Sequence, residues 1–141
     1  AAGDLFTEKD YADFELKVVY KVQWPANSGV WFRYQSPDKA YQADILEYTN
    51  PECYSGTIYC PGKMFLSMNT DKDLEKKDDW NTMEIKAKGD HLIVKLNGVV
   101  TGDVREDSFD TGKIGFQIHA GDEFNDMKLT VREIKLRPIA P

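Results

Sequence analysis

The chain has 141 residues and a formal charge of −6, with acidic and basic residues mixed along its length. A chain of this length buries roughly 70% of its unfolded surface, so we expect a single domain over residues 1–141. The acidic balance argues against nucleic acid as a partner, because phosphate binding needs a basic surface, and no apolar run approaches the ~20 residues that span a bilayer.

Regular alternation of apolar and polar residues predicts the first strands. Residues 5–7 form a short edge strand. Residues 14–22 form a long strand whose apolar face comprises Phe14, Leu16, Val18, Tyr20 and Val22. Because side chains alternate between the two faces of a strand, this pattern is typical of a half-buried antiparallel strand.

Two strands over residues 29–34 and 41–47 each have one apolar and one polar face. The core-facing residues are Val30, Phe32, Tyr34, Tyr41, Ala43 and Ile45. The opposite faces carry Trp31, Arg33, Gln42 and Asp44. Glu47 joins Asp44 on the polar face only if the second strand bulges near Leu46, and we expect that bulge.

Residues 49–79 are the least regular part of the chain. Turn signals at Asn50-Pro51 and Pro61-Gly62 separate short predicted strands over residues 56–59 and 63–68. The mixed charges of residues 71–79 indicate a solvated loop or a single helical turn.

Cys53 and Cys60 are the only cysteines, and neither has a His or Cys neighbour at a spacing typical of zinc sites. Either they form a disulfide that closes a short loop, or they are two free thiols. We favour the disulfide, which would place the protein outside the cytosol, in the periplasm or secreted. Residues 1–4 are not a signal peptide, so we expect a mature or trimmed chain.

Shorter strands complete the predicted fold. Residues 80–88 and 91–96 alternate, and Asn97-Gly98 is typical of a tight type I′ hairpin turn leading into residues 99–104. The last strand, residues 127–136, changes phase at Arg132-Glu133, which indicates a bulge. About ten short strands without a long helix predict an all-β, two-sheet antiparallel β-sandwich.

The strand over residues 113–119 repeats the two-faced pattern. Its inward residues are Ile114, Phe116 and Ile118, whereas Gln117 and His119 face outward. Three strands therefore present Trp31, Arg33, Gln42, Asp44, Gln117 and His119 from one side of a sheet. We expect these residues to form one concave site.

Six segments in order carry a resemblance to a known family. They are residues 14–17, 27–30 with Arg33, 80–82 with 84–85, 96–98, 115–119 and 133–136. This series resembles the 3-keto-disaccharide hydrolase family from Leu5 onward. The resemblance implies a concanavalin A-like jelly roll that acts on keto sugars.

The central strand departs from related carboxylate patterns. The family commonly shows an acidic residue, then Gln, then Asp, where this chain has Gln42, Asp44 and Glu47. The same run is similar to the Glu-x-Asp-x-x-Glu signature of laminarinase-type glucanases, but Gln42 replaces the nucleophile. Because an amide cannot form a glycosyl ester, the retaining two-carboxylate mechanism does not apply.

A 3-keto sugar needs different chemistry. The ketone acidifies the hydrogen at C2, so a base can remove it, the enolate can expel the C1 substituent, and water can then add. Asp44 or Glu47 is the expected base, Arg33 holds the enolate oxygen, and His119 protonates the leaving oxygen or binds a metal.

The remaining candidates bind the saccharide ligand. Gln42 and Gln117 suit sugar hydroxyls, and Trp31 and Trp80 suit the apolar face of a sugar ring. Each candidate also has a structural interpretation. Arg33 and Asp44 are equally typical of a cross-strand ion pair. His119 is also typical of a residue that makes a structural hydrogen bond, and Trp80 is also typical of a residue packed in the core.

No cofactor is required by this chemistry, and a divalent metal is only weakly indicated. His119 with Asp44 or Glu47 offers nitrogen and oxygen ligands for a metal ion. Asp122, Glu123 and Asp126 could hold calcium, although such acidic loops are usually solvated. The leading hypothesis is a keto-glycoside hydrolase or lyase. The alternatives are a non-catalytic carbohydrate-binding module and an adhesion or assembly domain.

Overall fold

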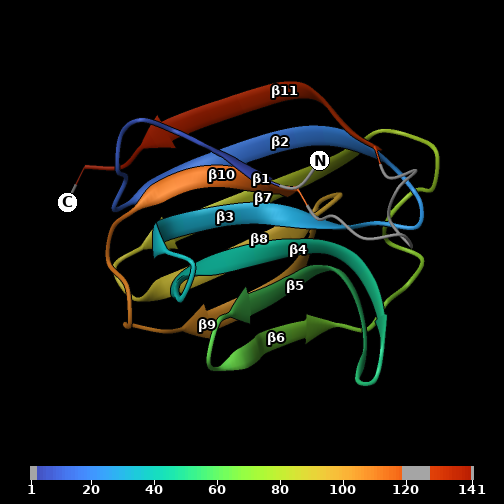
Figure 1. Cartoon of the computed structure of the whole chain (residues 1–141), viewed down its shortest axis with the longest axis horizontal. Helices are drawn as coiled ribbons and strands as arrows, with labels where there is room; N and C mark the ends of the chain where they lie inside the picture. Colours follow the sequence, from blue (N-terminus) through green and yellow to red (C-terminus); the bar gives the residue numbers. More distant parts are fainter. Residues whose placement is uncertain (1–2, 119–127, 141) are drawn as a thin grey trace.

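The computed structural model describes residues 3–118 and 128–140, and these residues form two antiparallel β-sheets that face each other (Figure 1). The strands are β1 (Gly3–Phe6), β2 (Phe14–Gln23), β3 (Asn27–Ser36), β4 (Lys39–Thr49), β5 (Glu52–Cys60), β6 (Met64–Asn69), β7 (Asn81–Lys88), β8 (His91–Leu96), β9 (Val99–Arg105), β10 (Lys113–Ile118) and β11 (Lys128–Pro138). The six-stranded sheet has the order β1-β10-β3-β4-β5-β6, and the five-stranded sheet has the order β11-β2-β7-β8-β9. The predicted β-sandwich is confirmed. The described part of the chain contains no helix long and apolar enough to cross a membrane.

The core lies between the two sheets and follows the predicted alternation. Phe14, Leu16, Val18 and Tyr20 of β2 are all buried. The Phe14 ring lies 6.1 Å from the ring of Phe32 on β3, which belongs to the other sheet. Since each fully buried large side chain contributes roughly 1.5–3 kcal/mol, this interface supplies most of the stabilisation.

Two local predictions are confirmed by the backbone. Asn97 and Gly98 both adopt positive φ, 51° and 85°, as a type I′ turn requires. The register of β11 against β2 shifts between Val131 and Glu133, so the predicted bulge lies at Arg132.

The predicted disulfide is wrong. Cys53 and Cys60 are both buried, free thiols on the same strand, β5. Seven residue steps of about 3.3 Å place their Cα atoms far beyond the ~7 Å that a disulfide can bridge. The strand predicted over residues 56–59 is longer than expected and contains both cysteines. The disulfide therefore no longer supports an extracytoplasmic location, which stays a prediction.

The charged segment between β6 and β7 is exposed over most of its length, as expected, but one side chain anchors it. Glu75 accepts hydrogen bonds from the Tyr20 hydroxyl and, at 2.7 Å, from the Ser55 hydroxyl. Burial raises the pKa of Glu75 above its ordinary value, while these hydrogen bonds act in the opposite direction.

Candidate active site

The three strands that were predicted to share a site lie side by side, as β10, β3 and β4 of the six-stranded sheet. Their register places Gly29 opposite both Asp44 and Gln117, so these three residues form one row across the sheet. Residues remote in sequence therefore meet on one face.

A hydrogen bond crosses the middle strand of this row. The Gln42 Nε2 donates to the Gln117 Oε1 at 2.7 Å. The Gln42 side chain passes over Gly29, where a Cβ atom would lie only 2.8 Å from the Gln42 Cδ. Because the Gln117 carbonyl accepts from Gln42, its amide hydrogens point away from Gln42 and have no partner among the described residues, so they can donate to a ligand oxygen.

A hollow of about 260 Å³ lies over this face of the sheet. Its lining residues are Asn27, Asp44, Leu46, Tyr48, Tyr59, Met64, Phe65 and Gln117. The strand order gives the hollow two halves. Amides from β10 and β3 line one half, aromatic and apolar side chains from the end of β4, β5 and β6 line the other, and Asp44 lies between them.

Asp44 is the acidic group of the hollow. The residue is 1% exposed, and its buried Oδ2 has no hydrogen-bond partner among the described residues. Burial raises the pKa of this carboxyl well above its ordinary value, because the charged form has lost its hydration. A buried carboxyl that lines a hollow and has an oxygen without a hydrogen-bond partner is a candidate for proton transfer.

Glu47 does not join Asp44. The pairing of β4 with β5 has the same register on both sides of Leu46, with Ala43 opposite Ile58 and Glu47 opposite Tyr54, so no residue is inserted and the predicted bulge is absent. Glu47 therefore lies on the other face of β4 and forms an exposed ion pair with Lys77 at 3.0 Å. The predicted second carboxylate of the site is wrong.

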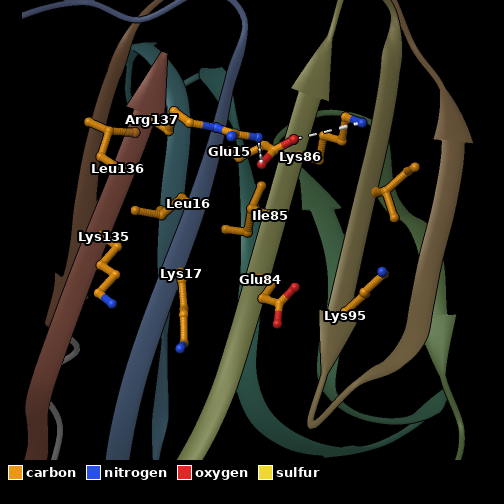
Figure 2. Close-up of a pocket in the computed structure, with 11 residues that line it drawn as sticks. Glu15, Leu16, Lys17, Glu84, Ile85, Lys86, Lys95, Lys135, Leu136 and Arg137 are labelled. Carbon is orange, nitrogen blue, oxygen red and sulfur yellow. Dashed lines mark hydrogen bonds and ion pairs between the residues drawn. The ribbon is translucent and has the colours of Figure 1, made fainter. Parts of the chain in front are cut away.

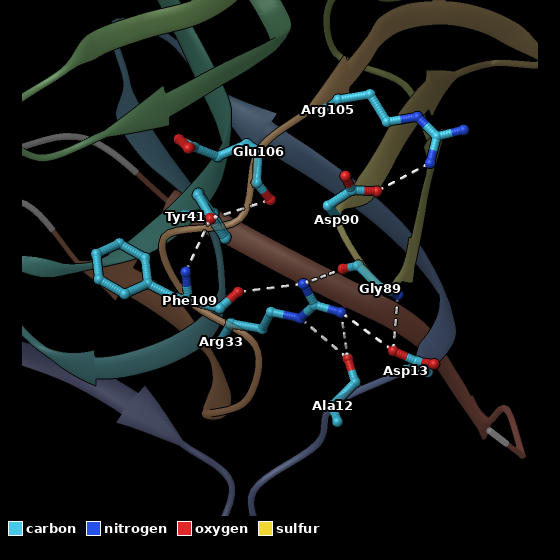
Figure 3. Close-up of polar contacts among 9 residues, drawn as sticks. All are labelled: Ala12, Asp13, Arg33, Tyr41, Gly89, Asp90, Arg105, Glu106 and Phe109. Atoms are coloured by element: carbon cyan, nitrogen blue, oxygen red, sulfur yellow. Dashed lines mark hydrogen bonds and ion pairs between the residues drawn. The ribbon is translucent and has the colours of Figure 1, made fainter.

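Arg33 is not a site residue either (Figure 3). Its backbone has φ 48°, and the register of β3 shifts after Phe32, so its side chain turns away from the predicted face and is 1% exposed. The guanidinium donates to the carbonyls of Ala12, Gly89 and Phe109 at 2.7–3.1 Å and pairs with Asp13 at 3.2 Å. Arg33 therefore ties together three segments of the backbone, and the ion pair with Asp44 does not exist.

The break at Arg33 also reverses the prediction for Tyr34. Instead of facing the core, the Tyr34 ring contacts the rings of Phe6 at 4.2 Å and Trp31 at 5.6 Å. Trp31 is 6% exposed and does not line the hollow, and its contact with sugar stays a prediction.

Trp80 immediately precedes β7 and lies against the other sheet. Its ring lies 5.0 Å from the Lys21 ammonium of β2 and 4.6 Å from the Arg132 guanidinium of β11. These are cation–π contacts, and they exclude the predicted role of Trp80 in the hollow.

Several predicted groups cannot be placed. His119, Asp122, Glu123 and Asp126 lie outside the described residues. Among the residues that are described, no three His, Cys, Asp or Glu side chains come close enough together to hold a metal ion. The metal alternative stays a prediction.

Sequence reasoning missed Asn27, Tyr48, Tyr59, Met64 and Phe65, all of which line the hollow. Tyr48 could have been found, because it continues the alternation of Gln42 and Asp44 along β4. The β5 and β6 residues enter through strand pairing, with Tyr59 opposite both Gln42 and Phe65.

A larger hollow of about 460 Å³ lies on the five-stranded sheet (Figure 2). Two acidic and five basic residues line it. Glu15 pairs with Arg137 at 2.5 Å and with Lys86 at 3.8 Å. Neither of its acidic residues, Glu15 and Glu84, is buried, so this hollow offers no counterpart of Asp44.

The family comparison matches almost the whole chain. A family model described as the 3-keto-alpha-glucoside-1,2-lyase-like domain matches residues 1–137. Among curated proteins there is no match.

Solved structures support the jelly-roll fold. A candidate glycosyl hydrolase from Parabacteroides distasonis ATCC 8503 is 22% identical, with a TM-score of 0.78 over 99% of this chain and 84% of that chain. The carbohydrate-binding module CBM66 from Bacillus subtilis is 13% identical, with a TM-score of 0.61 over 96% and 83% of the two chains. Galectin LEC-6 from Caenorhabditis elegans is 12% identical, with a TM-score of 0.60 over 97% and 91%. At these identities the likeness shows the fold alone.

Proposed function

Because the chain belongs to the 3-keto-alpha-glucoside-1,2-lyase-like domain family, we propose that it cleaves the bond between C1 and the glycosidic oxygen of 3-keto-glycosides, with Asp44 as the base. One observation carries the proposal. Asp44, whose desolvated carboxyl has a buried oxygen without a partner among the described residues, lines a hollow together with amide and aromatic side chains. Such lining suits a saccharide, since amides meet hydroxyl groups and apolar side chains meet the carbon faces of the ring.

The reaction needs one base and one stabilised oxyanion. Asp44 takes the proton from C2, and the electron pair moves into an enolate whose oxygen is that of the C3 ketone. The enolate then collapses, C1 and C2 become doubly bonded, and the C1 oxygen leaves with a proton taken from water. Addition of water across the new double bond would complete a net hydrolysis. A positioned base contributes about 10²- to 10⁴-fold to such a step.

Gln117 replaces Arg33 as the group that meets the enolate oxygen. Its carbonyl accepts from Gln42, so the amide hydrogens are directed away from that contact. A donor fixed before the reaction stabilises developing charge without reorganising during the step. Gln42 is a positioning residue in this scheme, because it acts through Gln117.

Burial raises the basicity of the Asp44 carboxylate. An exposed aspartate is fully ionised at neutral pH but is a weak base, whereas the raised pKa of Asp44 makes its carboxylate a stronger proton acceptor. The sugar itself excludes water from the hollow when it binds, which strengthens the effect.

The test compares a 3-keto-glucoside with its parent glucoside. We expect release of the C1 substituent from the ketone alone, because only the ketone acidifies C2. Asp44→Asn should lower the rate by at least about 10²-fold, whereas the matched control Glu47→Gln, which alters an exposed carboxylate outside the hollow, should retain it. Equal rates for Asp44→Asn and the parent protein would refute the assignment.

A carbohydrate-binding module is the second candidate, and the same hollow supports it. The mixture of amides and aromatic rings would serve binding as well as catalysis. Saturable binding of the keto sugar without turnover, lost when Gln117 is replaced by alanine, would favour this candidate over the enzyme. Self-association on size-exclusion chromatography with no saccharide binding would instead favour an assembly domain.

A further inference from the structure

The hollow around Asp44 is polar on one side and apolar on the other, and this asymmetry bears on the substrate. Across the sheet the order is β10, β3, β4, β5 and β6. Gln117 and Asn27 come from the first two strands, whereas Tyr59, Met64 and Phe65 come from the last two. Asp44 stands on the central strand between these groups.

The apolar half is a connected cluster of rings. The Phe65 ring lies 5.7 Å from the Tyr48 ring and 6.0 Å from the Tyr59 ring, and both contacts are edge-on. Tyr48 remains 42% exposed and Met64 54% exposed. Large apolar side chains gathered at the rim of a hollow are typical of a binding surface.

Met64 provides a second, independent observation. Its backbone has φ 64°, in the left-handed region that a residue with a β-carbon adopts at a cost. The side chain that this conformation presents is mostly exposed and lines the hollow. This conformation occurs where the turn over residues 61–63 joins β5 to β6, and it places an exposed apolar side chain at the hollow. The flexible thioether also adapts to ligands of different shape.

The proposed reaction decides which part of the substrate meets this cluster. C2 must lie at Asp44, and the ketone oxygen on C3 must lie near the Gln117 amide, on the β10 side. Because C1 and C3 are bonded to C2 in different directions, this placement lets C1 and its substituent extend toward β5 and β6. The hollow of about 260 Å³ is below the ~300–1,000 Å³ of sites that enclose a drug-sized ligand, so it accommodates one ring and leaves the substituent at the rim.

We propose that Tyr48, Tyr59, Met64 and Phe65 form the leaving-group subsite and that this subsite favours glycosides with flat aromatic aglycones. The inference rests on the proposed function, since the reaction sets the direction of C1. Tyr48 and Met64 are the specificity-determining residues, because they are the most exposed members of the cluster.

The test uses benzyl and methyl 3-keto-glucosides of the same anomer. Both release an alcohol of similar acidity, so a difference in kcat/KM reports on the aromatic ring and not on the leaving ability of the group. We expect the parent protein to favour the benzyl compound by about tenfold, which corresponds to the contribution of an aromatic contact. Tyr48→Ala and Met64→Ala should each reduce the ratio of kcat/KM for the benzyl compound to kcat/KM for the methyl compound severalfold. Tyr54→Ala is the matched control, because Tyr54 lies opposite Glu47 and does not line the hollow.

The outcomes separate the two proposals. The protein could turn over both ketones at equal kcat/KM, and no variant could change the benzyl-to-methyl ratio. This result would overturn the leaving-group subsite but would not contradict the proposed reaction. Absence of turnover for both ketones would refute the reaction. In that case calorimetry with benzyl and methyl glucosides decides the subsite. Tighter binding of the benzyl compound that Tyr48→Ala abolishes would support an aromatic subsite, and equal affinities would overturn it.

Discussion

Gln42 and Gln117 are joined by a side-chain hydrogen bond of 2.7 Å although their strands, β4 and β10, do not pair with each other. The bond spans the intervening strand β3, and it can do so only because Gly29 leaves room for the Gln42 side chain. One glycine thus allows two amides to meet beside Asp44 and fixes which end of Gln117 faces the hollow.

Removing the Gln42 donor should therefore impair the proposed reaction through Gln117. We expect Gln42→Leu to lower kcat by about tenfold or more, because an unanchored amide loses its orientation toward the enolate oxygen. The free energy of unfolding should fall by only about 1 kcal/mol, the usual net value of one hydrogen bond. Steady-state kinetics and urea denaturation measure the two effects. A change in KM alone would show that Gln42 contributes to binding and not to positioning.

Asp44 should reduce stability at neutral pH. Its folded pKa is raised by burial above the unfolded value near 3.9. Its contribution to stability is therefore fully present below pH ~4 and is lost as the pH rises through the folded pKa. Asn cannot ionise, so the thermal midpoint of Asp44→Asn should rise relative to that of the parent protein as the pH is raised from about 4 to 8. Melting curves across this range test the sign, and a growing deficit for the variant would contradict the burial argument.

Arg33 should act on folding and not on catalysis. Arg33→Met leaves the carbonyls of Ala12, Gly89 and Phe109 without their donor, so we expect a loss of about 3–5 kcal/mol in the free energy of unfolding. The matched control is Arg105→Met, which breaks an exposed pair with Asp90 and should cost less than about 1 kcal/mol (Figure 3). Urea denaturation compares the two variants. The remaining folded fraction of Arg33→Met should keep its specific activity, and similar costs for both variants would show that Arg33 is not a structural anchor.

The cysteines should remain reduced and react only after unfolding. Cys53 and Cys60 are buried, and burial raises the pKa of both thiols, which disfavours the reactive thiolate. We expect a thiol-specific alkylating reagent to modify neither residue in the native protein and both in denaturant without a reductant. Mass spectrometry counts the adducts. A denatured protein that resists alkylation until it is reduced would demonstrate a disulfide and contradict the strand geometry.

Local pattern was enough to predict much of the sheet. The alternation over residues 14–22 identified the buried face of β2, and the same reasoning placed Gln42, Asp44 and Gln117 on outer faces of their strands. The turn at Asn97-Gly98 and the bulge at Arg132 were also predictable, because positive φ and a change of phase leave a signature within a few residues.

What the tertiary structure alone decided was where that alternation breaks and what covers each face. Arg33 turns inward because its guanidinium binds three carbonyls that are distant in sequence. Glu47 lies opposite Tyr54 because no extra residue is inserted where β4 pairs with β5. Tyr59 and Phe65 reach the hollow only through the pairing of β4, β5 and β6. A period of two residues is a property of one strand, and sequence can report it. The burial of Asp44 and the contacts of Gln117 depend on neighbouring strands, whose positions are set by packing between segments far apart in the chain.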